Sequence, residues 1–240
     1  MLRGSLLVLV LLLLPCFAGL ARPADADDAA TGVIARTNAL RARNGLPPLH
    51  PGDALMRTAH DFAAYMARTG RYGHEADGRT PDARAKAHGY EACIVDENIG
   101  WVERAPPQSP QALADAFAGG WENSPAHRRN MLDPDVTETG VAIERHDSTG
   151  RWYAVQMVGR PLSGGISFSV TDAGPSVARY RLGARMYSLE PGVTRTHTVC
   201  RPAPLRVEAA AHADEQAVMP DDGAHYTLVQ QSGGWRLQRR

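Results

Sequence analysis

The sequence has few of the residues that would place it in several large classes of protein. Its 240 residues include only three cysteines and one lysine (Lys86), and the 26 basic side chains are balanced by 26 acidic ones, so the formal net charge is zero. Binding to a phosphate backbone normally needs a basic stripe, and no long run of like charge is present. We therefore expect no nucleic-acid partner.

Long apolar segments are also lacking, except near the N-terminus. Leu6 to Leu14 is an unbroken apolar run after Arg3, and small residues follow it up to Ala21. The run is short for a bilayer span, and this order of features is typical of a secretory signal peptide over residues 1–21. We expect no transmembrane span and a secreted or periplasmic protein. The alternative is a lipoprotein attached through Cys16, although Pro15 stands where a small residue is usual.

Two cysteines, Cys93 and Cys200, remain once the signal peptide is removed. An even pair in an oxidising compartment predicts a disulfide. The alternative is two separate buried thiols.

The first part of the chain reads as alternating helices and strands after a loose polar leader at residues 22–30. The expected helices cover residues 31–44, 53–69, 81–88 and 110–117, with a short one from 125, and the expected strands cover 94–101, 139–146 and 152–158. The expected N-caps are Asp53, Thr80, Ser109 and Ser124, and Gly119-Gly120 is expected to bend the chain before Trp121. The last strand is apolar on both faces, which favours an α/β fold: a three-layer α/β/α sandwich over residues 31–161.

Beyond a linker at residues 162–165 the pattern changes. Short strand-like runs separated by turn residues fill 166–240, at about 166–171, 177–182, 193–200, 204–208, 225–230 and 234–238. This pattern predicts a small all-β module, a sandwich or a barrel.

Three fragments carry a family resemblance. They are Tyr72-Gly-His74, Asp96-Glu-Asn-Ile99 and the stretch Trp121-Glu-Asn-Ser-Pro-Ala-His-Arg-Arg-Asn-Met-Leu132. In this order they resemble the CAP superfamily, also called the SCP or pathogenesis-related-1-like family, and its bacterial branch in particular. The resemblance covers residues 31–161.

The resemblance implies that His74, Glu97 and His127 converge in an open groove, where the two histidines can hold a divalent metal. Zinc suits neutral imidazoles, and a neighbouring carboxylate fixes the tautomer of an imidazole. Eukaryotic members have a second glutamate where this chain has Ser124; Glu122 lies two residues earlier, and Asn98 follows Glu97. The alternatives are that His74 only donates a hydrogen bond, that His127 only bonds a backbone carbonyl, and that Glu97 only braces its loop.

Several other polar residues have simpler interpretations. Asn38 and Arg41 match the family's Asn-x-x-Arg pattern, and we expect both to bond a neighbouring loop. Arg128 and Arg129 could form an anion-binding rim with Arg41, but pairing with acids such as Glu138 or Asp133 is favoured. The remaining histidines, namely 50, 60, 88, 146, 197, 212 and 225, are expected at the surface.

Two functions follow from the resemblance. One is a binding module that accepts a lipid, glycan or peptide at the cell envelope. The other is a metal-dependent hydrolase with Glu97 as general base. The first is favoured, because the chain has no His-Glu-x-x-His helix and no Gly-x-Ser-x-Gly motif. The fold alone does not determine the function.

Overall fold

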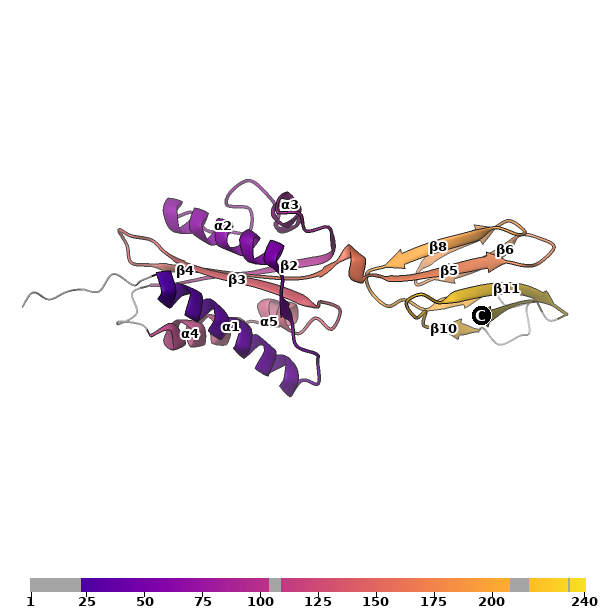
Figure 1. Cartoon of the computed structure of the whole chain (residues 1–240), viewed down its shortest axis with the longest axis horizontal. Helices are drawn as coiled ribbons and strands as arrows, with labels where there is room; N and C mark the ends of the chain where they lie inside the picture. The colour runs from indigo at the N-terminus through magenta and orange to yellow at the C-terminus, as the bar shows by residue number, and fades with distance from the viewer. Residues whose placement is uncertain (1–22, 104–108, 208–215, 233) are drawn as a thin grey trace, which may run out of the picture.

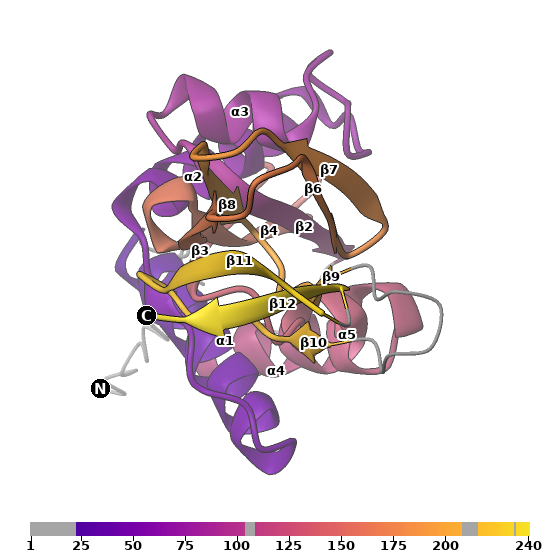
Figure 2. The same ribbon diagram turned by 90° about the vertical axis from the view of Figure 1, so that its right-hand side faces the viewer.

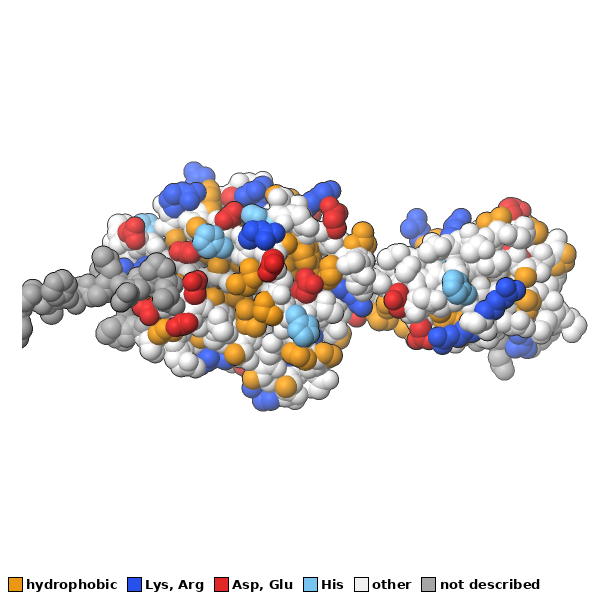
Figure 3. Space-filling view, in the orientation of Figure 1, with side chains coloured by type: hydrophobic (Ala, Val, Ile, Leu, Met, Phe, Trp, Pro, Cys, Tyr) orange, Lys and Arg blue, Asp and Glu red, His pale blue; other side chains and the backbone are white. Residues whose placement is uncertain are grey.

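The structure is a computed structural model that describes residues 23–103, 109–207, 216–232 and 234–240. The expected signal peptide with Cys16, and His212, lie outside these residues. Two lobes are joined by a narrow waist, and on the face seen in Figure 3 acidic and basic side chains are interspersed over both lobes. In the described part of the chain, no helix has the length and apolar character needed to cross a bilayer.

The first lobe is a four-stranded sheet covered by helices on both faces (Figures 1 and 2). Its strands, in the order β1-β3-β4-β2, are β1 (His50–Pro51), β3 (Glu138–Arg145), β4 (Trp152–Pro161) and β2 (Ala92–Val102). Its helices are α1 (Pro23–Arg43), α2 (Asp53–Thr69), α3 (Pro81–Ala87), α4 (Pro110–Glu122) and α5 (Pro125–Met131). Helices α2 and α3 lie on one face and α1, α4 and α5 on the other, so the expected α/β/α sandwich is confirmed.

The strand pattern explains this layering, because neighbouring side chains of a strand point to opposite faces. Ala154 of β4 packs with Phe117 of α4, whereas the next residue, Val155, packs with Phe62 of α2. Helix α2 approaches the sheet so closely that a Cβ at Gly140 of β3 would lie 2.2 Å from the helix backbone. Only glycine fits at that contact.

Two helix boundaries differ from the sequence-based expectation. Helix α1 begins at Pro23, so the predicted loose leader is wrong for residues 23–30: Ala29 and Ala30 are buried against α4. Helix α4 continues through Gly119 and Gly120 to Glu122 instead of bending. Burial of Trp121 four residues after Phe117, in the same core, offsets the roughly 1 kcal/mol that each interior glycine costs.

The expected N-caps have mixed outcomes. Ser109 accepts a hydrogen bond from the backbone N–H of Ala112, as predicted. Asp53 is not the cap, because α2 begins at that residue and Gly52 precedes it. Thr80 and Ser124 stand at the N-cap positions of α3 and α5, but neither side chain makes a capping hydrogen bond. The Thr80 hydroxyl bonds the Asp82 side chain instead.

The second lobe consists of two four-stranded sheets with an apolar core between them, which is a sandwich. One sheet has the order β10-β9-β6-β7, with β10 (Ala217–Val218), β9 (Leu205–Val207), β6 (Ala178–Leu182) and β7 (Arg185–Leu189). The other has the order β12-β11-β5-β8, with β12 (Gly234–Arg239), β11 (His225–Gln231), β5 (Ile166–Asp172) and β8 (Thr194–Val199). Strands β7 and β10 were not expected from the sequence.

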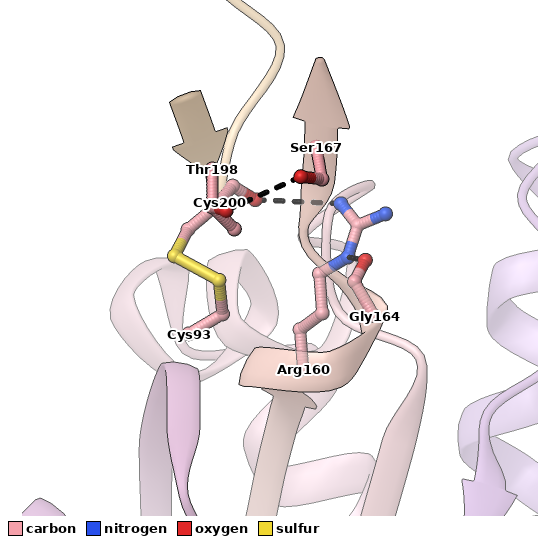
Figure 4. The surroundings of a disulfide bond; sticks show 6 residues. All are labelled: Cys93, Arg160, Gly164, Ser167, Thr198 and Cys200. Atoms are coloured by element: carbon pink, nitrogen blue, oxygen red, sulfur yellow. Dashed lines mark hydrogen bonds between the residues drawn. A yellow bond between two sulfur atoms is a disulfide. The ribbon is translucent and has the colours of Figure 1, made fainter. Parts of the chain in front are cut away.

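The lobes are connected by η1 (Leu162–Gly164) and by a disulfide between Cys93 and Cys200 with an S–S distance of 2.02 Å. Figure 4 shows Arg160 beside this bond, where its guanidinium donates to the carbonyls of Gly164 and Cys200. The predicted disulfide is therefore confirmed. It links β2, the strand that carries Glu97, to the segment that follows β8.

Candidate functional site

His74, Glu97 and His127 meet at the open edge of the sheet. His74 lies in the loop after α2, Glu97 on β2 and His127 in α5. Among the described strands β2 pairs only with β4, so groups from both helical layers can meet over its free edge. The Nδ1 atom of His74 lies 2.8 Å from Oε1 of Glu97, and the charge of His74 acts on the pKa of His127.

Glu97 is buried and both of its oxygens are used. Its side chain is 1 % exposed; Oε1 accepts from Nδ1 of His74 and Oε2 accepts from Nη2 of Arg84 at 2.7 Å. A carboxylate only accepts hydrogen bonds, so Nδ1 of His74 must carry a proton. The lone pair of neutral His74 is then on Nε2, on a side chain that is 52 % exposed.

Arg84 of α3 holds Glu97 in place, and sequence reasoning missed it. Its side chain is 2 % exposed, and besides Glu97 it donates to Asp77 at 2.8 Å and to the carbonyl of His74 at 2.8 Å. Its guanidinium also lies 3.6 Å from the centroid of the Phe62 ring. Arg84 thus fixes both partners of the His74–Glu97 pair.

His127 differs from His74 in having a buried ring nitrogen, Nδ1, without a hydrogen-bond partner in the described part of the chain. The alternative that its ring bonds a backbone carbonyl is therefore wrong for this nitrogen. Burial lowers the pKa of His127, and the neighbouring His74 lowers it further. The neutral imidazole, which is the metal-binding form, is favoured.

Amide side chains fix α5 against β2. Asn98 donates to the carbonyl of His127 at 3.2 Å and to Oε1 of Gln156 at 3.0 Å. Asn130 donates to Oδ1 of Asn98 at 2.9 Å and to the carbonyl of Glu97 at 3.3 Å. Asn98 therefore positions the backbone of His127, as a groove residue should, and Asn130 and Gln156 join it. Asn130 stands within the fragment that carries the family resemblance, but no role was predicted for it or for Gln156.

The free edge of β2 is also occupied by aromatic side chains. The indole N–H of Trp121 donates to the carbonyl of Ile99 at 3.1 Å, and the hydroxyl of Tyr72 donates to the same carbonyl at 3.3 Å. Burial raises the pKa of Tyr72, and the charge of Glu97 raises it further. The Tyr72 hydroxyl accordingly remains a donor.

Other predicted site residues lie elsewhere. Glu122 does not join the groove, because its carboxylate pairs with Arg43 at 3.2 Å. In the described part of the chain, Ser124 makes no capping bond and no hydrogen bond to His74, Glu97 or His127. Arg41 is buried and donates to four backbone carbonyls, so it cannot be part of an exposed rim. The loop-bonding role expected for Arg41 is confirmed, as it is for Asn38, which bonds Leu49 in both directions.

Two further expectations about charged side chains are wrong. Asp133 does not pair with Arg128 or Arg129, because it binds Arg201 of the second lobe at 2.6 Å. Within the described ranges, neither Arg128 nor Arg129 has an acidic partner. His197 is buried instead of exposed, and its Nε2 lies 2.7 Å from the hydroxyl of Tyr180.

His74 and His127 are the candidate metal ligands among the residues that the structure describes. The described residues contain no group of three or more His, Cys, Asp or Glu side chains arranged for a metal. His74 carries its Nε2 on an exposed side chain, and the imidazole of His127, whose pKa is lowered by burial and by His74, lies near it. Two histidines leave coordination positions for water or a ligand. Glu97 is already committed to two partners.

Comparison with known proteins agrees with the resemblance found in the sequence. The model of the cysteine-rich secretory protein (CAP) family matches residues 34–158. The uncharacterized protein YkwD of Bacillus subtilis is 27% identical over 129 residues, which are 53% of this chain and 46% of that protein. The chain thus matches less than half the length of this relative.

Two solved structures are similar at lower identity. An outer surface protein of Borrelia burgdorferi is 18% identical with a TM-score of 0.49, covering 56% of this chain and 93% of that one. An extracellular SCP-domain protein of Bacillus anthracis is 21% identical with a TM-score of 0.48, covering 60% and 45%. Since the family match alone covers more than half of the sequence, the chain belongs to the CAP family.

Proposed function

We propose that the protein is an exported binding module whose groove holds one divalent metal ion, zinc, between His74 and His127. The ion and the groove walls then receive a lipid, glycan or peptide of the cell envelope. The observation that carries the proposal is the contrast between the two rings. His74 has its Nδ1 fixed by Glu97, and His127 has a buried Nδ1 without a partner.

The electrostatics of the groove support this. A metal-binding histidine commonly donates its other ring N–H to a carboxylate, which is the arrangement of His74 and Glu97. Burial lowers the pKa of His127, so this ring loses its proton readily. A bound zinc ion would polarise a ligand oxygen as a Lewis acid.

Binding is favoured over hydrolysis by the position of Glu97. A general base must have a free lone pair directed at the proton that it removes. The two oxygens of Glu97 accept from His74 and Arg84, and the side chain is 1 % exposed. A side chain this buried cannot approach the proton of a substrate, so Glu97 is suited to orienting His74.

Export is supported by two independent features. The Cys93–Cys200 disulfide is a bond that persists in oxidising compartments and is rare in the cytosol. The family is described as secretory. The N-terminal sequence adds the pattern expected of a signal peptide.

Calorimetric titration of zinc into the metal-free protein tests the proposal. His74→Gln and His127→Gln should each remove most of the heat of binding, and Glu97→Gln should weaken affinity about 10–100-fold through loss of the tautomer control. His50→Gln is the matched control, because His50 is exposed and distant in sequence from the groove. Unchanged zinc affinity in both His74→Gln and His127→Gln, with melting temperatures preserved, would refute the metal site.

Turnover assays separate binding from hydrolysis. The zinc-loaded protein should leave peptide, ester and glycan substrates intact. Turnover that depends on zinc and disappears in Glu97→Gln would instead establish the hydrolase.

A further inference from the structure

A pocket lies beside α5, the helix that carries His127. Pro125, Arg128, Arg129 and Leu132 recur at helical spacing along α5 and its C-cap, and they line a cavity of about 750 Å³. His127 is not part of this lining. Cavities of this size are typical of small-ligand sites.

Two other parts of the chain complete the wall. Asp96 contributes from β2, where it precedes Glu97 and therefore points to the opposite face of the strand. Arg201 contributes from the second lobe, directly after the disulfide-bonded Cys200. Residues of both lobes therefore line the pocket, and the Cys93–Cys200 disulfide joins the two lobes next to it.

Three of the six charged side chains that line the pocket already have partners. Arg201 binds Asp133 at 2.6 Å and Asp135 at 2.8 Å, and Glu122 binds Arg43. Arg201 in this way neutralises an aspartate that would otherwise repel an anionic ligand.

Three charges of the wall have no partner within the ranges that the structure describes. They are the guanidiniums of Arg128 and Arg129, and the half-buried carboxyl of Asp96. Burial raises the pKa of Asp96, the charge of Asp133 raises it further, and Arg201 opposes this. A carboxyl that is partly removed from water without a hydrogen bond is costly, and a ligand that donates to it would remove the cost.

We propose that this pocket binds a short peptide by its two charged ends, with the carboxylate at Arg128 and Arg129 and the ammonium group at Asp96. A simple anion such as phosphate would satisfy the guanidiniums and leave Asp96 unpaired, whereas a zwitterion satisfies both. Pro125 and Leu132 supply apolar contacts for small side chains between the ends. The inference does not depend on a metal in the His74–His127 groove.

The test is calorimetric titration of the full-length mature protein, free of zinc, with tri-alanine. Tri-alanine should bind, and both N-acetyl-tri-alanine and tri-alanine amide should bind at least about tenfold more weakly. The double variant Arg128→Gln/Arg129→Gln should lose binding. Asp96→Asn should bind tri-alanine and its N-acetyl form equally, while still discriminating against the amide.

Two controls keep the result interpretable. Arg179→Gln removes an exposed arginine of β6 in the other lobe and should leave binding unchanged. Asp96→Asn removes an unpaired carboxyl, so its melting temperature should not fall.

Three results would overturn the proposal. The first is equal affinity for the free and end-blocked peptides, and the second is a dissociation constant weaker than about 10 mM for tri-alanine. The third is inorganic phosphate binding as tightly as tri-alanine and displacing it, which would leave an anion site only.

Discussion

The two lobes differ in what they bury. The first lobe encloses charged and amide side chains, and these converge on β2 and the helices beside it: Arg41, Arg84, Glu97, Asn98 and Gln156. The second lobe encloses mainly aliphatic and aromatic groups, and its buried polar residues serve local structure. Asp172, for example, accepts from the backbone of Gly174 and Ala178 and so closes a turn.

The difference indicates where the molecule accepts a cost in folding free energy near its candidate functional residues. Burying an ion pair costs desolvation that the pairing offsets only when the geometry is good. In the first lobe the cost falls at Glu97, which contacts the half-exposed imidazole of His74. In the second lobe a buried histidine, His197, is instead surrounded by aromatic rings and bonded to Tyr180. We therefore expect the stability of the first lobe to depend most on its buried charged groups. The stability of the second lobe should depend most on the packing of its core.

The largest effect should come from Arg84→Met. The change leaves Glu97 buried without its cation, and we expect a loss of about 3–5 kcal/mol in the free energy of unfolding, measured in urea. The double variant Arg84→Met/Glu97→Leu should recover much of this loss. If the single variant loses less than about 1 kcal/mol, Arg84 does not hold Glu97 and the contrast between the lobes is weakened.

Removing the disulfide should have the next largest effect. Cys93→Ser/Cys200→Ser opens a loop of sequence separation 107, and a loss of about 2–4 kcal/mol is expected from denaturant unfolding. Reduction of the parent protein with dithiothreitol should give a matching loss. Unfolding as two separate transitions would show that the bond couples the lobes.

Tyr180→Phe should produce a smaller loss confined to the second lobe. Burial raises the pKa of Tyr180 to about 12, so its hydroxyl keeps its proton, and it lies 2.7 Å from Nε2 of His197. Without this hydroxyl, the buried Nε2 of His197 has no hydrogen-bond partner. We expect a loss of about 1–3 kcal/mol in the free energy of unfolding, measured by thermal unfolding. The matched change Tyr187→Phe, at a half-buried ring, should cost less than about 0.5 kcal/mol. Neither variant should alter zinc binding.

The smallest expected effect is a change in how the melting temperature depends on pH. Burial and His74 lower the pKa of His127, so below its ordinary value of about 6.5 the unfolded chain takes up a proton before the folded one. Stability from this residue is therefore present above pH 6.5 and is lost as the pH falls through the lowered pKa. The melting temperature should fall less between pH 7.5 and 5 in His127→Gln than in the parent. His197 also has a lowered pKa, and its contribution cancels in this difference.

Much of the first lobe could be predicted from sequence because its patterns are local. The apolar stripe of α2, the first-turn prolines of α3, α4 and α5, and the alternation of β3 and β4 each follow from neighbouring residues. The predicted boundaries of α1 and α4 were wrong, because packing between helices that are distant in the sequence determines them. Ala29, Ala30 and Trp121 are buried through contacts that no local rule contains.

The candidate site was only partly predictable. The motif residues led to His74, Glu97 and His127, but nothing local distinguishes Arg84 from the exposed arginines of the chain. Its role depends on α3 folding back over Phe62 and β2. Likewise, Asp133 is not available to Arg128 or Arg129, because it pairs with Arg201, which lies 68 positions further along the chain.

The side-chain donors along β2 affect how separate copies of this molecule can associate. An uncovered strand edge offers its carbonyls to any extended chain, and such edges seed aggregation. Asn130, Trp121 and Tyr72 already fill the outward carbonyls of Glu97 and Ile99. The edge of β2 can therefore remain uncovered at high protein concentration without seeding aggregation.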